Sequence, residues 1–528
     1  MHGDSERADE GAGMGKVVRE LTSGTIRGDE VCGGRVARFL GVPYGGEVEG
    51  RQRFCPPRPA RSWPGVRDAT AIGPAAPQPP MTFAAGPRRE RMLALIAEMR
   101  CTEAQGENCL VLNVWEPTWS ASTDRPVMVS LHGGAHTFGS GSMPVYDGAA
   151  LAGRHDVVVV SVNHRLGALG YLYLADVLGD KYAVSGNVGT LDLVAALEWV
   201  QANAEAFGGD PSNVTIFGES GGGFKVSTLL AMPGAGGLFH RAIVQSGAKL
   251  HALSPDSATA TTCAVLDELG LGTHPGGLHD VPAAEIVAAQ VRVLGGPFSP
   301  GPRTLGPVID GVTLARHPFD PDAPSVSASV PLLIGTTKDE MTFFTHSNQA
   351  LETLDDAAAV AAAIPMVGDR ARDLYDIYLA TQPDVSHARR LAAIMTDRMR
   401  VGSIRLAERK AAAGGAPVWM YRFDFETDVE DGALGATHAS DIAYTFGNPD
   451  ASALSGSRPE RYAVADMMSD VWAAFARNGS PQAANLPLVV RGAVPLPVRF
   501  PIPLSIRACD FPHTAYRRSS GHGYAAFG

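Results

Sequence analysis

A serine flanked by glycines follows a short run of β-branched and aromatic residues. The run ends at Phe217, and the next five residues are Gly218-Glu219-Ser220-Gly221-Gly222. A serine hydroxyl presented on a sharp turn between a strand and a helix needs neighbours without bulk, and glycine accepts a positive φ there at little cost. Ser220 is therefore a candidate nucleophile. The helix predicted after it would direct the N–H of Gly221 toward negative charge that develops beside Ser220.

The five-residue pattern alone is weak, because a chain with 60 glycines also places serines in ordinary turns. A second segment of small residues supports the nucleophile. Leu131-His132-Gly133-Gly134-Ala135 follows a predicted strand, so the N–H groups of Gly134 and Ala135 are candidate donors to an oxyanion alongside Gly221. Without the serine motif, this segment would be interpreted as a tight turn.

A serine nucleophile also needs an acid and a base, which follow this motif along the chain in that order. The predicted strand 330–335 leads to the adjacent carboxylates Asp339 and Glu340. Sites in open α/β sheets lie at the carboxyl ends of strands, which favours one of these two residues as the acid. The residues themselves leave the choice open, and a carboxylate in such a loop is most often only solvated.

The candidates for the base are the histidines that follow Glu340, namely His346, His387, His438, His513 and His522. His438 lies in a loop after the predicted strand 418–425, and a loop carried by a rigid sheet suits a catalytic base. The others lie close behind the acid, in a polar stretch or in an irregular tail. We expect His438 to be the base; without a preceding serine and acid it would be interpreted as a surface histidine.

The elements around these residues alternate between strands and helices. Strands are predicted at 109–114, 126–131, 157–163, 214–217, 241–245, 330–335 and 418–425, and helices at 191–207, 224–232, 357–379, 389–413 and 462–478. Short antiparallel strands are predicted before them, at 16–21, 25–27 and 35–41. This order indicates an α/β fold with a large, mostly parallel central sheet flanked by helices, N-terminal antiparallel strands and helical insertions.

Composition argues against several classes of partner. The chain of 528 residues carries a net charge of −11, which argues against binding to nucleic acid or to an anionic membrane surface. No apolar run approaches the roughly 20 residues that span a bilayer, and residues 1–14 lack the pattern of a signal peptide, so we expect a cytoplasmic protein. The six cysteines are scattered without metal-type spacing, which predicts reduced thiols and no metal site.

With these residues assembled, the chain resembles the type B carboxylesterase and cholinesterase family of α/β-hydrolases, from about Val17 to Pro487. Besides the two glycine-containing segments, four others match in the right order: Arg38-Phe39-Leu40-Gly41-Val42-Pro43-Tyr44, Glu107-Asn108-Cys109-Leu110-Val111-Leu112-Asn113, Gly186-Asn187-Val188-Gly189-Thr190-Leu191-Asp192 and Phe207-Gly208-Gly209-Asp210-Pro211. The resemblance implies a serine carboxylesterase with the α/β-hydrolase fold. Such an enzyme would hydrolyse uncharged, small-molecule carboxylic esters through a Ser-His-Glu triad and an acyl-enzyme, without a metal or cofactor.

The resemblance also assigns residues that the pattern left open. It selects Glu340 rather than Asp339 as the acid, and it supports His438 as the base because the family's histidine precedes a Phe-Gly pair, here at Phe446. The remaining assignments that it implies are the nucleophile Ser220, an oxyanion hole formed by Gly134, Ala135 and Gly221, supporting positions at Glu219 and Ser246, and structural ion pairs of Arg53 with Glu107 and of Arg165 with Asp192.

The chain departs from the family at several positions. His136 stands where phenylalanine is common, His164 where tyrosine is usual and Asp441 where glutamate is usual. We expect His136 to be a hydrogen-bonded structural residue rather than part of the pocket. Ala76 stands where secreted relatives have the cysteine that pairs with the equivalent of Cys109, which agrees with a reducing compartment. Residues 64–114 contain no tryptophan and a single aromatic residue, which argues against a choline substrate.

We expect a disordered tail at 1–16, an α/β-hydrolase domain at 17–487 and an atypical C-terminal tail at 488–528. The last segment has five arginines and one acidic residue in an otherwise acidic chain, which suggests a changed reading frame or poor order. We expect the pocket walls to come from 80–105 and 250–350. Two alternatives stay open, a catalytically silent binding module and a hydrolase of thioesters, amides or carbamates. The sequence predicts neither the ester nor the oligomeric state.

Overall fold

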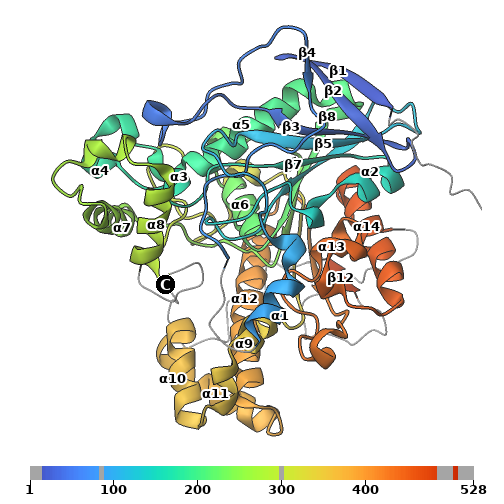
Figure 1. Cartoon of the computed structure of the whole chain (residues 1–528). Helices are drawn as coiled ribbons and strands as arrows, with labels where there is room; N and C mark the ends of the chain where they lie inside the picture. Colours follow the sequence, from blue (N-terminus) through green and yellow to red (C-terminus); the bar gives the residue numbers. More distant parts are fainter. Residues whose placement is uncertain (1–14, 82–87, 296–302, 484–503, 509–528) are drawn as a thin grey trace, which may run out of the picture.

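The computed structural model describes residues 15–81, 88–295, 303–483 and 504–508 of the chain. Its centre is one twisted sheet in the order β1-β2-β3-β5-β7-β6-β8-β9-β10-β11-β12, with β4 paired to β2 (Figure 1). Helices cover both faces of this sheet. The α/β architecture predicted from the alternation of elements is confirmed.

The N-terminal end of the sheet is antiparallel. It contains β1 (Lys16–Leu21), β2 (Gly24–Val31), β3 (Val36–Pro43) and β5 (Val111–Pro117), with the short β4 (Val66–Asp68) parallel to β2. β5 then pairs antiparallel with β7, which joins this part to the centre. The predicted antiparallel strands are thus present: β1 matches its predicted bounds, and β2 and β3 begin and end within four residues of theirs.

The centre of the sheet is parallel. It consists of β7 (Val158–Val162), β6 (Arg125–Leu131), β8 (Gly209–Glu219), β9 (Arg241–Gln245), β10 (Leu332–Thr337) and β11 (Val418–Phe423). Because parallel strands end at the same edge of a sheet, the residues that follow β6, β8 and β10 meet there. Every residue of β6, β7 and β10 is buried, as strands covered on both faces require.

Side chains alternate between two hydrophobic layers along the central strands. On β6, Val127, Val129 and Leu131 pack on one face together with α5 (Val188–Asn203), α6 (Gly221–Leu229) and the end of α12 (His387–Ala412). Met128, from the same strand, packs on the other face with α2 (Ala149–His155), α13 (Ile442–Thr445) and α14 (Glu460–Asn478). The two-residue period of the strand produces this sandwich.

The remaining helices lie outside the sandwich. α3 (Gly167–Tyr171), α4 (Ala175–Leu178), α7 (Pro255–Glu268) and α8 (Ala283–Leu294) surround a separate hydrophobic cluster, and α1 (Arg89–Leu95) and α9 (Thr342–Ser347) contribute to another. α10 (Asp356–Val367) and α11 (Ala371–Thr381) pack on the beginning of α12 and form the lobe at the bottom of Figure 1. None of the helices described here combines the length and apolar character of a membrane span.

One predicted helix differs from the structure, and the two predicted tails lie mostly outside the described residues. The helix predicted at 357–379 is divided into α10 and α11, because Gly368 adopts a φ of +62° that a continuous helix does not allow. Of the predicted tail at 488–528, the structure describes only β12 (Leu504–Ala508), which pairs antiparallel with β11. Of the predicted tail at 1–16, only the last two residues are described, and Lys16 already begins β1.

Candidate active site

Ser220 occupies the turn between β8 and α6. Its backbone has φ +55° and ψ −117°, a region that non-glycine residues seldom adopt. The glycines around it allow the turn to approach β6. A Cβ at Gly222 would lie 2.0 Å from the carbonyl oxygen of Leu131, and a Cβ at Gly218 would lie 2.5 Å from the same atom. The N–H of Ser220 donates to the carbonyl of Gln245 at 2.8 Å, which fixes the turn against β9.

The loop after β6 lies directly against this turn. Gly134 and Ala135 adopt φ values of +92° and +52°, and a Cβ at Gly221 would lie 2.2 Å from the nitrogen of Ala135. The three predicted donors are therefore brought together. Within the described part of the chain, no acceptor takes the N–H of Gly134, Ala135 or Gly221. Three free N–H groups that converge beside a serine can bind a developing oxyanion.

The adjacent carboxylates after β10 point to different partners. Glu340 is fully buried, and its Oε2 lies 2.6 Å from Nδ1 of His438. Its Oε1 accepts hydrogen bonds from Ser246 Oγ at 2.5 Å and from the N–H of Thr337 at 2.9 Å. Asp339 instead accepts the N–H of Ala436 at 3.1 Å and so holds the loop that carries His438. The structure therefore places Glu340, and not Asp339, against the histidine.

Burial and hydrogen bonding act in opposite directions on Glu340. Burial alone would raise the pKa of its carboxyl group. The hydrogen bonds from His438, Ser246 and Thr337 outweigh burial and hold that pKa below its ordinary value. Glu340 is therefore an anion at neutral pH and can orient the ring of His438.

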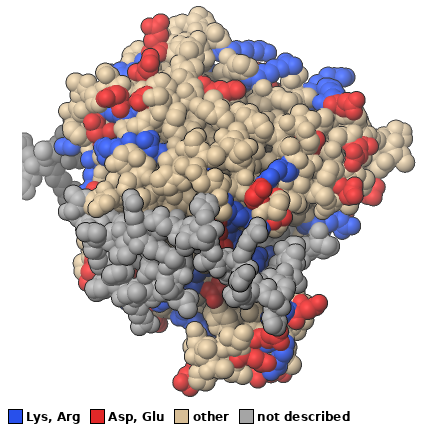
Figure 2. Space-filling model, turned by 180° about the vertical axis from the view of Figure 1, so that it is seen from behind, with Lys and Arg blue, Asp and Glu red and all other residues tan. Residues whose placement is uncertain are grey.

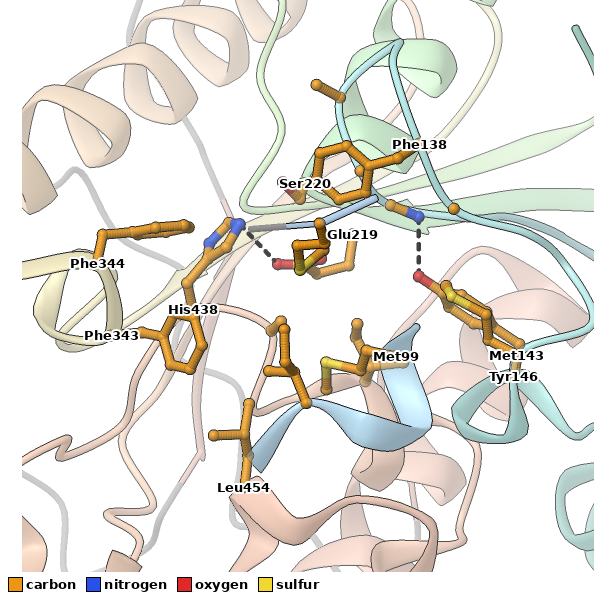
Figure 3. A pocket seen from close by; sticks show the side chains of 18 of the residues that line it. Met99, Phe138, Met143, Tyr146, Glu219, Ser220, Phe343, Phe344, His438 and Leu454 are labelled. Atoms are coloured by element: carbon orange, nitrogen blue, oxygen red, sulfur yellow. Dashed lines mark hydrogen bonds and ion pairs between the residues drawn. The ribbon is translucent and has the colours of Figure 1, made fainter. Parts of the chain in front are cut away.

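The other ring nitrogen of His438 faces Glu219. Its Nε2 lies 3.3 Å from Glu219 Oε1, and Ser220, Glu219 and His438 point into the same space (Figure 3). No hydrogen bond joins His438 to Ser220 Oγ among the described residues. Burial alone would lower the pKa of His438, but the carboxylates of Glu219 and Glu340 raise it above its ordinary value. Burial also raises the pKa of Glu219, but the positive charge of protonated His438 acts against burial, so Glu219 ionises most readily when His438 is protonated.

Ser220 lines a cavity of about 260 Å³. Its polar lining consists of Tyr146, Glu219, Ser220 and His438, with the backbone of residues 133–135, here called the oxyanion loop after its predicted role. The other lining side chains are apolar (Figure 3). The predicted wall segments contribute Met81, Ile96, Met99, Phe343 and Phe344. Sequence reasoning did not predict Phe138, Met143, Tyr146, Met399, Ile442 and Leu454, which also line the cavity. Of these residues, only Phe138, Met143 and Tyr146 could have been predicted from the sequence, because they follow the oxyanion loop directly.

Other predicted residues lie around the site. Arg53 Nε donates to Glu107 at 2.6 Å, and Arg165 pairs with the buried Asp192 at 2.6 Å, so both structural ion pairs are confirmed. His136 is buried outside the cavity lining, as expected, but its two ring nitrogens have no hydrogen-bond partner among the described residues. The hydrogen-bonded role expected for it is therefore not found.

No cluster of potential metal ligands occurs in the described ranges. All five cysteines in these ranges, including Cys109, are free thiols. Cys509 lies outside the described residues.

A sequence model described as the carboxylesterase family matches residues 15–492. The chain belongs to this family. It is 36% identical over 484 residues to the para-nitrobenzyl esterase of Bacillus subtilis, covering 88% of this chain and 91% of that protein. It is 33% identical over 476 residues to the fumonisin B1 esterase of Sphingopyxis macrogoltabida, covering 88% of this chain and 83% of that protein.

Solved carboxylesterase structures have the same fold. Carboxylesterase EST55 of Geobacillus stearothermophilus superimposes with a TM-score of 0.77 at 39% identity, covering 89% of this chain and 92% of that one. A para-nitrobenzyl esterase superimposes with a TM-score of 0.75 at 32% identity over the same shares. The predicted resemblance and the α/β-hydrolase fold are confirmed, and this carboxylesterase family member is a carboxylic ester hydrolase of the serine-esterase class.

Proposed function

We propose that Ser220, His438 and Glu340 form the catalytic triad of this esterase, and that Gly134, Ala135 and Gly221 form its oxyanion hole. The observation that carries the proposal is the buried contact between Glu340 and His438, 2.6 Å long, at the wall of the cavity that also holds Ser220. An anionic acid on Nδ1 leaves Nε2 as the basic nitrogen, which faces the cavity.

The reaction follows from these positions. Ser220 Oγ attacks the ester carbonyl carbon while His438 Nε2 takes the Oγ proton. The carbonyl oxygen becomes an oxyanion and accepts hydrogen bonds from Gly134, Ala135 and Gly221. His438 then gives its proton to the leaving alcohol, and the acyl group stays on Ser220. A water molecule repeats the sequence and releases the acid, with His438 again moving the proton.

Glu219 and Ser246 support the base in this scheme. Ser246 holds Glu340 by the hydrogen bond to Oε1, which restricts the carboxylate to the orientation that reaches His438. Glu219 places a second carboxylate near Nε2. Both carboxylates stabilise the imidazolium that forms when His438 takes the Ser220 proton.

The cavity supports uncharged esters as substrates. Its lining is mainly methionine, phenylalanine and branched aliphatic side chains, which favour apolar acyl or alcohol groups. Hydrolysis of thioesters, amides or carbamates uses the same acyl-enzyme and stays an alternative activity, and a silent binding module stays an alternative class.

We further propose that the enzyme acts in the cytoplasm without nucleic-acid partners. The free Cys109 supports a reducing compartment, because Ala76 stands at the position of its expected partner. Basic and acidic side chains are interspersed over the described part of the face in Figure 2, so this part lacks the broad basic area that binds nucleic acid.

The test compares hydrolysis of p-nitrophenyl esters of increasing acyl length by the wild type and by Ser220→Ala. Ser227→Ala is the matched control, because Ser227 lies on the same helix but donates to the carbonyl of Gly247 instead. We expect the wild type and Ser227→Ala to turn over and Ser220→Ala to lose activity by about 10⁴-fold or more. Mass spectrometry after treatment with an organophosphonate should place the adduct on Ser220.

Two results would contradict the proposal in different ways. A phosphonate adduct on Ser220 without ester turnover would favour a thioester, amide or carbamate substrate, which the same variants can test. A folded wild type that forms no adduct and shows no turnover would favour the silent binding module.

A further inference from the structure

Lys225 is a buried lysine on the helix that begins at the nucleophile. It lies in the second turn of α6, five residues after Ser220, and its side chain is fully buried. No carboxylate among the described residues forms an ion pair with it. Burial without a counter-charge lowers the pKa of its ammonium group to about 7. Burying an unpaired lysine costs free energy and is unusual in a protein core, so its ammonium group needs a specific hydrogen-bond acceptor.

That partner is the oxyanion loop. Nζ of Lys225 donates to the carbonyl oxygen of His132 at 2.7 Å. The same peptide group is held at its other end, because the N–H of Gly133 donates to Tyr146 Oη at 2.8 Å. A peptide group is planar, so two partners on its opposite atoms fix its orientation. The next two residues along the chain, Gly134 and Ala135, carry the proposed oxyanion donors.

The histidine rings around Lys225 carry no positive charge of their own. His132, His136 and His164 are buried, and burial lowers the pKa of each ring well below its ordinary value, with the nearby lysine charge acting in the same direction. Their rings are therefore neutral at pH 7. The carbonyl of His132 is the protein acceptor that the structure shows for the Lys225 ammonium group.

We propose that Lys225 is a positioning residue for acyl transfer: by holding the peptide between His132 and Gly133, it orients the N–H groups of Gly134 and Ala135 toward the oxyanion. This inference rests on the proposed function. The loop must be rigid before the transition state forms, since donors that reorganise during the reaction stabilise the oxyanion less. Loss of Lys225 should therefore weaken binding of the transition state and leave binding of the ground-state ester almost unchanged.

The chain contains a matched control. Lys410 on α12 is also buried without a carboxylate partner in the described residues, and burial also lowers its pKa. Its Nζ donates to the carbonyls of Ser327 and Ala328, which lie outside the cavity lining. Lys410→Met therefore removes the same kind of interaction and measures its effect on stability alone.

The experiment measures kcat and KM for a p-nitrophenyl ester with the wild type, Lys225→Met, Lys225→Gln and Lys410→Met. It also measures the affinity of an aryl trifluoromethyl ketone, to which Ser220 Oγ adds so that the ketone oxygen occupies the oxyanion hole. Circular dichroism and thermal unfolding show whether each variant is folded. Lys225→Gln keeps an N–H donor without the charge and tests the role of the hydrogen bond.

We expect Lys225→Met to lower kcat by about tenfold or more, with KM within about twofold of the wild type. The affinity for the ketone should fall by the same factor as kcat/KM, and Lys225→Gln should recover part of both losses. Lys410→Met should lower the unfolding temperature and leave kcat unchanged.

A folded Lys225→Met that keeps kcat within twofold would overturn the proposal, and so would a loss of kcat without a parallel loss of ketone affinity. If Lys225→Met does not fold, the same criteria apply to Lys225→Gln. Failure of the proposed function looks different, because then the wild type itself shows no turnover or Ser220→Ala stays active.

Discussion

In the proposed mechanism, Glu219 acts on the base His438 from the turn that holds Ser220. It precedes Ser220 in the chain, yet its carboxylate reaches Nε2 of His438 at 3.3 Å. His438 must be neutral to accept the Ser220 proton, and the negative charges around it raise its pKa. In this mechanism kcat/KM falls as the pH drops through the pKa of His438. Each nearby carboxylate moves this acid limb of the pH profile toward higher pH.

Glu219→Gln should consequently extend activity to lower pH. Removing the charge lowers the pKa of His438, so the acid limb of kcat/KM should move down by about one pH unit. The measurement is the pH profile of kcat/KM for the variant and the wild type, with Glu268→Gln on the surface as control. An acid limb that stays in place or moves to higher pH would show that Glu219 does not act on the base.

The buried ring of His136 affects the stability of the fold rather than catalysis. Its ring packs against Tyr171 and Phe224 with centroid distances of 4.7 and 6.2 Å, and neither ring nitrogen has a described partner. Burial, followed by the charges of Lys249 and Lys225, lowers its pKa well below the ordinary value. In the unfolded chain this histidine binds a proton near pH 6.5, whereas in the folded chain it does not. The stability present above pH 6.5 is therefore lost as the pH falls.

His136→Phe should make the free energy of unfolding less sensitive to acid. Each pH unit below about 6.5 costs about 1.4 kcal/mol through one such histidine. Between pH 7.5 and 5.5, the variant should therefore lose about 1 kcal/mol less than the wild type in urea unfolding. His274→Phe at an exposed position is the control. Equal losses in all three proteins would mean that His136 is protonated in the folded state.

At the scale of elements, the site depends on how closely β6, β8 and α6 approach one another. Lys225 and the glycines of the turn both allow the loop after β6 to lie close to α6, since this loop passes over the first turns of that helix. The isolated bridge between Asp339 and Thr437 likewise joins the loop after β10 to the loop of His438. Backbone contacts between loops therefore set the positions of the residues in the proposed triad.

Gly222→Ala tests this contact directly. Its Cβ would lie 2.0 Å from the Leu131 carbonyl oxygen, so the backbone must move. We expect a loss of about 1–3 kcal/mol in the free energy of unfolding and a clear fall in kcat. Gly234→Ala is the control, because a Cβ there meets no atom within 4 Å. Wild-type stability and turnover in Gly222→Ala would show that the turn can relax without cost.

At the scale of the whole molecule, β12 ties the C-terminal region to the sheet. Its register pairs Trp419 with Ala508 and Phe423 with Leu504, so β12 covers an edge that β11 would otherwise expose. The predicted tail at 488–528 therefore contains at least one strand. Whether its sequence arises from a changed reading frame stays a prediction for resequencing.

Replacing Ser505 and Ile506 together by proline should break this pairing, because proline cannot donate to the ladder. We expect the free energy of unfolding to fall by about 1 kcal/mol, the order of one backbone hydrogen bond. kcat should stay within twofold, since the described cavity lining includes no residue of β12. Unchanged unfolding would show that the strand contributes nothing to the stability of the sheet.

The sequence alone was sufficient for features that depend on neighbours along the chain. The turn at Ser220 requires glycines on both sides, the oxyanion loop requires small residues after a strand, and alternating elements require a parallel sheet. These are local backbone constraints, so they are visible in short segments. Family resemblance then selected Glu340 over Asp339, a choice that the residues themselves had left open.

Tertiary structure decided the contacts between distant segments. His438 and Glu340 are 98 residues apart, Lys225 and His132 are 93 apart, and the cavity draws its walls from Met81 to Leu454. No local pattern marks such partners, because the energy of a buried hydrogen bond or a packed methionine depends on which atoms the fold brings within contact distance. For the same reason Lys225 resembles an ordinary helix residue in the sequence and becomes a candidate for function only in the folded chain.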